Sequence, residues 1–313
     1  MSKTLTIRYT SDTHGYLYPT HYADMQDRPM GLMKLASEYP HDGNTLIIDG
    51  GDTIQGSPLT NLYQRLSPEE KAACLTEDAY GTHPIAAMMN LAGYQFVTLG
   101  NHDFNYGVDA LLDYLTNLDA LCLCANIRDK EGRLPIAPYA VHQLENGLRV
   151  GLVGVCTHFV RRWENPKTVE QLVIEEPIPA AKAALEAVKP LCDITVLIYH
   201  GGFECDLETG EPLTASAENQ ACQMCRELDF DLVLTGHQHM RVDGVHFGHS
   251  FAVQPTYRAP HCCGVTVTVE DDGSKRFESR IIPAEGKPLE SAYNLLMPLE
   301  KRVQKWLDTP AGH

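Results

Sequence analysis

Five apolar, strand-like runs of this chain each lead into a short cluster of polar residues. The clusters contain two aspartates, one asparagine and five histidines, namely Asp12, His14, Asp52, Asn101, His102, His200, His237 and His239. In open α/β sheets, functional side chains collect outside the carboxyl ends of the strands. We therefore expect these residues, which lie far apart in the sequence, to meet at one edge of the fold.

Strand-like and helix-like segments alternate along most of the chain. Apolar runs predict strands at 4–10, 45–48, 96–99, 120–125, 139–144, 149–155, 194–199 and 232–235. Residue spacing and composition predict helices at 31–38, 83–91, 108–118, 179–188 and 216–227. Later strands, at 250–254, 264–270 and 276–282, have an antiparallel pattern. This order predicts an α/β fold with a mixed sheet, or with two packed sheets, flanked by helices.

Two segments stand outside this alternation. Residues 56–82 form an insertion directly after Asp52, and Ser67 with Glu70 gives part of it a capping-box start. An insertion in this position can line one side of the site formed at the strand ends. Residues 289–307 predict a helix with one apolar face, and the residues after it resemble the start of a linker. The sequence therefore predicts a main domain at 1–285 and a linker helix at 286–313 that leads to a further domain.

The charge balance excludes one class of partner. The chain has 25 basic and 41 acidic side chains, which gives a formal net charge of −16. A nucleic-acid surface is basic, so we expect no nucleic-acid partner. An acidic protein also repels phosphate-bearing ligands at long range. Any phosphate site here needs local positive charge, which bound metal ions supply.

The termini and cysteines bear on the compartment. The N-terminus has no apolar region of a signal peptide, and no apolar stretch approaches the length of a membrane span. We therefore predict no membrane association and a cytoplasmic protein, unless an export signal was removed. The ten cysteines are expected to be reduced, since several lie in apolar runs and the chain is too large for a disulfide scaffold. Cys222 and Cys225 lack the second pair that a zinc site needs.

The clustered carboxylates need a counter-charge. Unpaired carboxylates at the ends of apolar strands cost several kcal/mol when desolvated, and no matching set of lysines or arginines lies beside them. A pair of divalent cations resolves this imbalance. Mixed oxygen and imidazole ligands suit Mn²⁺, Fe²⁺, Zn²⁺ or Co²⁺ better than Mg²⁺ or Ca²⁺. Two such ions about 3.5–4 Å apart can generate hydroxide from bound water at neutral pH.

The motifs resemble those of the calcineurin-like metallophosphoesterases. They are Asp12-x-His14, Gly51-Asp52, Gly100-Asn-His-Asp103 and Gly236-His-x-His239. The resemblance implies a four-layer αββα sandwich of two mixed sheets flanked by helices, with the catalytic domain at 1–285. It implies one metal ion on Asp12, His14, Asp52 and His239. Asp52 would bridge to a second ion, held also by Asn101, His200 and His237. His102 would protonate the leaving oxygen or steady the transferring phosphoryl group.

Longer motifs narrow the resemblance. Asp52-Thr-Ile-Gln-Gly-Ser-Pro-Leu59, Met89-Asn-Leu-Ala-Gly-Tyr94 and Gly100-Asn-His-Asp-Phe-Asn-Tyr-Gly107 are similar to the 5′-nucleotidase family. They are most similar to its 2′,3′-cyclic-nucleotide 2′-phosphodiesterase/3′-nucleotidase branch. The 5′-nucleotidase branch usually has an aspartate at the position of Asn105, which here can orient His102 by a hydrogen bond. That family also carries a C-terminal domain that stacks on the nucleobase, and 286–313 resembles the linker towards it.

Several further residues are candidates for contacts at the site. Asn101, Asp103 and Tyr257 are candidate substrate contacts, although a structural turn at Tyr257 is equally plausible. Arg161 and Arg162 either contact phosphate or form a solvated pair in a loop, and the solvated pair is the favoured interpretation. Glu204 is an outside candidate for a substrate contact. Asp49 and Asp206 are expected to cap or orient the backbone.

These features predict a dinuclear metal-dependent phosphoesterase that acts on nucleotides. The favoured reaction is hydrolysis of 2′,3′-cyclic nucleotides and 3′-nucleotides by in-line attack of metal-bound hydroxide. A 5′-nucleotidase or nucleotide-sugar hydrolase of the same fold is the first alternative. A catalytically inactive metal-binding module is the alternative from another class. The predicted partner is a small-molecule nucleotide, and the oligomeric state stays open.

Overall fold

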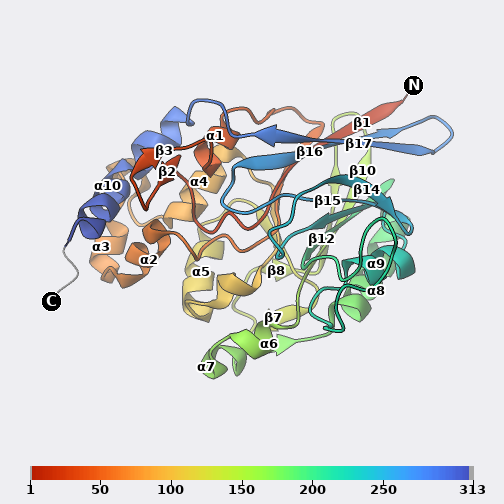
Figure 1. Cartoon of the computed structure of the whole chain (residues 1–313), viewed down its shortest axis with the longest axis horizontal. Coiled ribbons are helices and arrows are strands. Elements are labelled where there is room, and N and C mark those ends of the chain that lie inside the picture. Colours follow the sequence, from red (N-terminus) through yellow and green to blue (C-terminus); the bar gives the residue numbers. More distant parts are fainter. Residues whose placement is uncertain (1, 310–313) are drawn as a thin grey trace.

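Two large mixed β-sheets form the centre of the computed structural model, which describes residues 2–309 (Figure 1). The first sheet has the order β17 (Lys275–Pro283), β16 (His261–Val269), β1 (Lys3–Thr10), β4 (Thr45–Asp49), β5 (Phe96–Val97), β6 (Leu121–Leu123) and β8 (Ile136–Ala137). The second has the order β14 (Val242–Phe247), β15 (Ser250–Gln254), β13 (Leu232–Thr235), β12 (Ile194–His200), β10 (Arg149–Cys156) and β9 (Tyr139–Gln143). Two short strand pairs join β7 (Ile127–Asp129) to β11 (Leu172–Ile174) and β2 (Thr20–His21) to β3 (Gln26–Asp27).

Helices cover the outer face of each sheet. On the side of the first sheet are α1 (Leu32–Ala36), α2 (Pro58–Arg65), α3 (Pro68–Ala72), α4 (Pro84–Ala92), α5 (Val108–Thr116) and α10 (Glu290–Leu307). On the side of the second are α8 (Pro177–Val188) and α9 (Ala221–Glu227). The short helices α6 (Val160–Trp163) and α7 (Pro166–Val169) follow β10, and single 3₁₀ turns lie at η1 (Glu77–Ala79), η2 (Asn101–Phe104) and η3 (Lys189–Leu191). Figure 1 shows α4 and α10 at one side of the molecule and α8 and α9 at the other.

Three apolar cores separate the four layers. The core between the sheets contains Leu5 and Ile7 of β1 together with Val196 and Ile198 of β12. A second core joins the first sheet to its helices, and a third joins the second sheet to α8 and α9. All seven residues of β12 are buried, because this strand is covered on both faces. The predicted α/β fold of two mixed sheets flanked by helices is confirmed.

The strand register brings the carboxyl ends of the central strands together. In the first sheet β1, β4 and β5 are parallel, and Thr10 of β1 pairs with Asp49 of β4. In the second sheet β12 runs parallel to β13, and Tyr199 pairs with Thr235. The hydroxyl of Tyr9 donates a hydrogen bond to the Thr235 carbonyl oxygen at 3.1 Å, which joins the ends of the two sheets. Loops that leave these strands therefore start from a common edge.

Some predicted elements have different bounds. The helix expected at 216–227 begins only at Ala221, because the segment before it is held as a loop in which Asn219 Oδ1 accepts from the Gly202 amide. The insertion at 56–82 contains α2, α3 and η1, and the capping box of Ser67 and Glu70 is present. α10 packs against α2 and α4 within the first sheet's outer core. The predicted boundary at 285 therefore divides elements that share one core, while residues 310–313 of the predicted linker lie outside the described residues.

The expectation of reduced cysteines is wrong at one pair. Cys205, in the loop after β12, forms a disulfide with Cys222 at the start of α9. No local pattern marks this pair, because the pairing depends on how the loop returns to α9. The other eight cysteines are free, and all but Cys192 are buried. Disulfides are typical of oxidising compartments. Among the described helices, none combines the length and apolarity needed to cross a bilayer.

Candidate metal centre and active site

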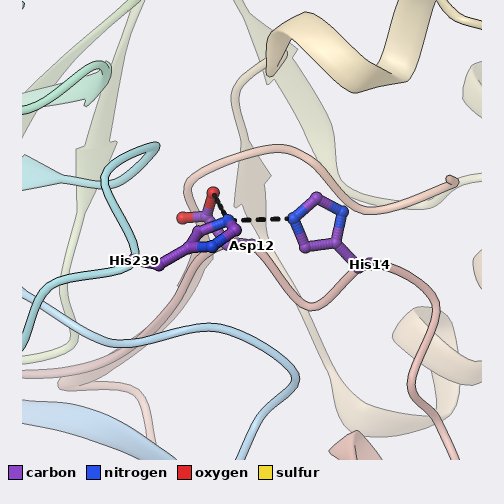
Figure 2. Close-up of side chains that lie close together, drawn as sticks. All are labelled: Asp12, His14 and His239. Carbon is purple, nitrogen blue, oxygen red and sulfur yellow. Dashed lines mark hydrogen bonds and ion pairs between the residues drawn. The ribbon is translucent and has the colours of Figure 1, made fainter. Parts of the chain in front are cut away.

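The first group of predicted ligands lies where β1 and β13 end. Asp12 and His14 follow β1, and His239 follows β13 (Figure 2). The Nε2 atoms of His14 and His239 are 3.1 Å apart, and His239 Nε2 is 3.5 Å from Asp12 Oδ1. Figure 2 shows the two imidazole rings and the carboxylate converging on one point. This spacing allows one ligand atom from each residue to reach the same ion.

The second group lies beside the first. Asp52 follows β4, His200 is the last residue of β12 and His237 follows β13, and their ligand atoms can also meet at one ion. Asp52 Oδ2 is 3.3 Å from His200 Nε2 and 4.0 Å from His14 Nε2. The carboxylate of Asp52 therefore reaches towards both groups, as a bridging ligand must.

Two buried atoms in this region make no hydrogen bond among the described residues. They are Asn101 Oδ1 and His200 Nε2, and the second faces the Asp52 carboxylate at 3.3 Å. Buried polar atoms are almost always hydrogen-bonded, so these two atoms require an explanation. Both atom types are metal ligands. The donor set therefore fits a pair of divalent cations.

The backbone at these residues is strained. Eight described residues other than glycine have positive φ, and five of them are predicted ligands: Asp12, His14, Asp52, His237 and His239, with φ between 49° and 72°. Left-handed backbone is uncommon for residues other than glycine, although Asp and His adopt it more often than most, and such residues cluster at functional sites. The strain aims these side chains into the site from tight turns at the strand ends.

The other ring nitrogen of each of three histidine ligands is held by the protein. His14 Nδ1 lies 2.9 Å from the Gln55 carbonyl oxygen, and His200 Nδ1 lies 2.7 Å from that of Gly50. His237 Nε2 lies 2.8 Å from Glu218 Oε1. Metal-binding histidines normally donate their second N–H to an oxygen in this way, which fixes the ring and the tautomer.

His102 lies next to the bridging carboxylate. Its backbone amide donates to Asp52 Oδ1 at 2.7 Å, and its ring centroid is 5.4 Å from that of His14. Its Nδ1 is 2.8 Å from Asn105 Oδ1. This bond leaves Nε2 as the ring nitrogen available for proton transfer. The structure thus brings together seven of the eight residues that the strand ends singled out, and the eighth, Asn101, precedes His102 in the turn η2.

Comparison with known proteins identifies the family. The profile of the calcineurin-like phosphoesterase family matches residues 5–241, which is most of the chain. The chain belongs to the calcineurin-like phosphoesterases. Curated relatives include the trifunctional nucleotide phosphoesterase protein YfkN of Bacillus subtilis, with 27% identity over 75% of this chain and 16% of the relative. Another is the 2′,3′-cyclic-nucleotide 2′-phosphodiesterase/3′-nucleotidase of Salmonella typhimurium, with 25% identity over 92% of this chain and 46% of the relative.

A solved structure supports the same placement. A candidate 5′-nucleotidase from Staphylococcus aureus superposes with a TM-score of 0.84 at 29% identity, over 98% of this chain and 59% of that one. These proteins are longer than this calcineurin-like phosphoesterase chain, which spans less than half of the two curated relatives. The predicted relation to the 5′-nucleotidase and cyclic-phosphodiesterase families is confirmed.

Electrostatics explain how the site keeps its carboxylates charged. Asp12 and Asp52 are almost fully buried, and their only ion-pair partners among the described residues are histidines. Burial alone would raise the pKa of Asp52, but His200, His14 and His102 together hold it well below its usual range. Burial would lower the pKa of His200, but Asp52 raises it to about 10. Within the described residues, these buried carboxylates have no lysine or arginine as a partner.

Asp103 has a different place from the one predicted. Its carboxylate is 1% exposed and accepts from the backbone amides of Asp52, Thr53, Ile54 and Gly100 at 2.8–3.0 Å. It therefore ties the turn after β4 to the turn after β5, and both of its oxygens accept hydrogen bonds from backbone amides. Asp49 acts similarly beneath the site, where it accepts from Thr10 and Thr53 hydroxyls, and burial raises its pKa to about 7.

Other candidates divide between the site and the scaffold. Tyr257 stacks on His239 with ring centroids 4.3 Å apart and stays 37% exposed, so it borders the site. Glu204 instead caps α9 by accepting from the amides of Cys222 and Gln223. Asp206 accepts from the amides of a turn, as expected. Arg161 pairs with Glu176, and Arg162 lies over the Phe159 ring.

Sequence reasoning missed three residues at this site. Glu218 contacts His237, Trp163 stacks on His237 at a centroid distance of 5.4 Å, and Glu164 accepts from Asn105 Nδ2. They come from loops and short helices without apolar periodicity. Arg258, which adjoins the candidate contact Tyr257, donates its amide to the Asp12 carbonyl oxygen and lies over the rings of Tyr16 and Tyr257. The tripeptide Arg162-Trp163-Glu164, soon after the buried strand β10, was the one available signal.

Proposed function

We propose that this chain is a dinuclear metal-dependent phosphoesterase that hydrolyses nucleotides, with 2′,3′-cyclic nucleotides and 3′-nucleotides as its preferred substrates. One observation carries the proposal: two three-residue ligand groups lie side by side at the joined strand ends, with Asp52 reaching both. Among the relatives, the Salmonella protein has the name of this activity. Because the chain spans less than half of that relative, the substrate is a proposal for this chain.

We assign the metal ligands as follows. Asp12, His14 and His239 hold one ion, Asn101, His200 and His237 hold the other, and Asp52 is shared. The mixture of carboxylate, amide and imidazole donors fits Mn²⁺, Zn²⁺, Fe²⁺ or Co²⁺. When bound, such a pair supplies positive charge to the phosphoryl oxygens and activates the attacking water. Positive charge at this point also offsets the acidic surface of the chain, which otherwise repels a phosphate.

The chain's own residues position the reaction. His102 would act as the imidazolium, with a proton on each ring nitrogen: Nε2 gives its proton to the leaving oxygen, and the neutral ring that remains keeps the Nδ1 proton, which Asn105 Oδ1 accepts. Asp103 fixes the turns that carry Asp52 and His102, so that both stay in place when substrate binds. The exposed rings of Trp163 and Tyr257 stack on His237 and His239 and provide flat apolar surfaces near the site. Such surfaces suit a nucleobase.

An activity panel tests this proposal. The protein with Mn²⁺ is assayed on 2′,3′-cyclic AMP, 3′-AMP and 5′-AMP, and we expect hydrolysis of the first two to be fastest. Asp52→Asn is expected to remove the activity, because the variant loses the shared charge at both ions. Asp272→Asn, in the distant turn between β16 and β17, is the matched control and keeps full activity, since an asparagine preserves its turn hydrogen bond.

The same panel separates the alternatives. The Staphylococcus aureus structure favours a 5′-nucleotidase as the second candidate, and faster hydrolysis of 5′-AMP would support it. No hydrolysis of any substrate with Mn²⁺, Co²⁺ or Zn²⁺ would instead support an inactive metal-binding module. The further nucleotide-binding domain after residue 313 stays a prediction, as does the division of the chain at residue 285.

A further inference from the structure

Both the oxygen and the NH₂ group of the Asn105 side chain make hydrogen bonds. Its Oδ1 faces Nδ1 of His102 at 2.8 Å, and its Nδ2 donates to Glu164 Oε1. Glu164 lies directly after α6, nearly sixty residues further along the chain, and reaches the turn η2 that carries His102. A continuous chain of hydrogen bonds therefore runs from a carboxylate through an amide to the imidazole.

The carboxylate decides which way the amide points. An asparagine side chain can rotate so that either its oxygen or its NH₂ group faces a neighbour. An ionised carboxylate only accepts hydrogen bonds, so Glu164 selects the orientation that turns the NH₂ group towards itself. The amide oxygen must then face His102, and Nδ1 must carry a proton. This arrangement fixes the neutral ring of His102 as the Nδ1–H tautomer, so that Nε2 is the nitrogen that takes up a proton to form the imidazolium and gives it to the leaving oxygen.

Glu164 is not explained by packing. It is 8% exposed, and its side-chain hydrogen-bond partner among the described residues is the neutral amide of Asn105. A buried carboxylate without a cation is destabilising, so a purely structural position would favour a neutral side chain. The neighbouring Trp163 stacks on His237, which places this short segment against the active site.

We propose that Glu164 is a positioning residue that acts through Asn105 to hold His102 in its reactive orientation and tautomer. The inference rests on the proposed function, because it takes His102 as the proton donor to the leaving oxygen. It also explains why position 105 is an asparagine and not an aspartate. An aspartate at this position would place a second carboxylate against Glu164, whereas an asparagine links Glu164 to His102 without repulsion.

The first test is the Glu164→Gln variant. Glutamine has its own NH₂ group, so it no longer selects one orientation of Asn105. We expect kcat for 3′-AMP to fall about tenfold or more, as part of the contribution of a general acid, with KM and metal content within about twofold. The loss should be smaller for p-nitrophenyl phosphate, whose leaving group needs little protonation. Glu170→Gln, an exposed glutamate further along the same segment, should match the unmodified protein.

Two further variants distinguish positioning from a structural role. In a His102→Ala background, Glu164→Gln should cause no additional loss, because residues that act as a unit are not additive. The double variant Asn105→Asp with Glu164→Gln reverses the polarity of the chain, because the glutamine NH₂ group then donates to a carboxylate at position 105. This exchange should recover most of the activity lost in Glu164→Gln. Unchanged kcat in Glu164→Gln, or an equal loss in the His102→Ala background, would overturn the inference.

A spectroscopic measurement keeps the test independent of activity. Long-range ¹H–¹⁵N NMR spectra of the Zn²⁺-loaded protein with labelled histidine report the tautomer of each ring, and His102→Ala assigns the signal of His102. We expect the neutral ring to carry its proton on Nδ1 in the unmodified protein and a mixture in Glu164→Gln. The same tautomer in both proteins would contradict the inference. If the unmodified protein hydrolyses no substrate while the tautomer changes as expected, the proposed function fails and the positioning role stands.

Discussion

His83 is expected to make the fold sensitive to acid. The side chain is 1% exposed and begins α4, where its Nδ1 accepts from the Ile85 amide at 3.3 Å. Its Nε2 is buried without a hydrogen-bond partner among the described residues, and the rings of Tyr63 and Tyr114 lie 4.9 and 5.4 Å away. Protonation would remove the cap and place a charge between these rings. Burial therefore lowers the pKa of His83 from 6.5 to about 3.

The sign and size of the effect follow from proton binding. Between pH 6.5 and about 3 the unfolded chain binds a proton at this histidine and the native protein does not. The contribution of His83 to the free energy of unfolding is therefore fully present above pH 6.5. It decreases as the pH falls, by about 1.4 kcal/mol per pH unit. Over the two units from pH 6.5 to 4.5 this amounts to about 3 kcal/mol, a large share of the stability of a typical domain.

The assay is urea unfolding of the unmodified protein and of His83→Asn between pH 7.5 and 4.5. Asparagine keeps a helix cap but does not titrate, so the variant lacks this part of the pH dependence. At pH 7.5 it should be the less stable protein, because it loses the contacts with Tyr63 and Tyr114. The difference in free energy of unfolding between the two proteins should become about 3 kcal/mol smaller at pH 4.5. His249→Asn, at an exposed histidine, is the control. A gap that stays constant across this range would refute the reasoning.

Three further changes have outcomes that the structure specifies. Ser67→Ala removes the side-chain half of the α3 capping box and should cost about 1 kcal/mol of stability in thermal unfolding, with activity unchanged. Gly100→Ala places a methyl group against Asp52 Oδ1 and should weaken Mn²⁺ binding in calorimetry by about tenfold or more, while Gly273→Ala, in an open turn, should not. Reduction of the Cys205–Cys222 disulfide, which closes a 17-residue separation, should lower stability in urea by about 3 kcal/mol. An unchanged midpoint after reduction would show that this bond does not constrain the unfolded chain.

The predicted elements were those with local signals. Apolar runs such as 194–199 and 232–235 marked the central strands, and the polar residues directly after them marked the strand ends. The order of these elements predicted an α/β fold with one mixed sheet or two packed sheets flanked by helices, and the family resemblance implied the two-sheet form. β14 was not predicted, because it is an edge strand with a bulge at Val242 to Val245 and most of its residues are partly or fully exposed. Short edge strands of this kind lack the apolar alternation on which such predictions depend.

The inner part of the site was predictable and its supporting contacts were not. Asp12, Asp52 and His200 lie at strand ends, so one strong local pattern placed each of them. Asp103 is different, because its role depends on amides from two turns that meet only in the folded chain. Glu164 likewise reaches Asn105 across the site from a short helix. Contacts of this kind are set by tertiary packing, which no single stretch of sequence records.

Anomalous diffraction from crystals grown with Mn²⁺ locates the metal ions directly. We expect two peaks per chain, one among Asp12, His14 and His239 and one among Asn101, His200 and His237, with Asp52 between them. Both peaks should weaken in Asp52→Asn. A single peak, or peaks away from these side chains, would contradict a dinuclear centre at the joined ends of the two sheets.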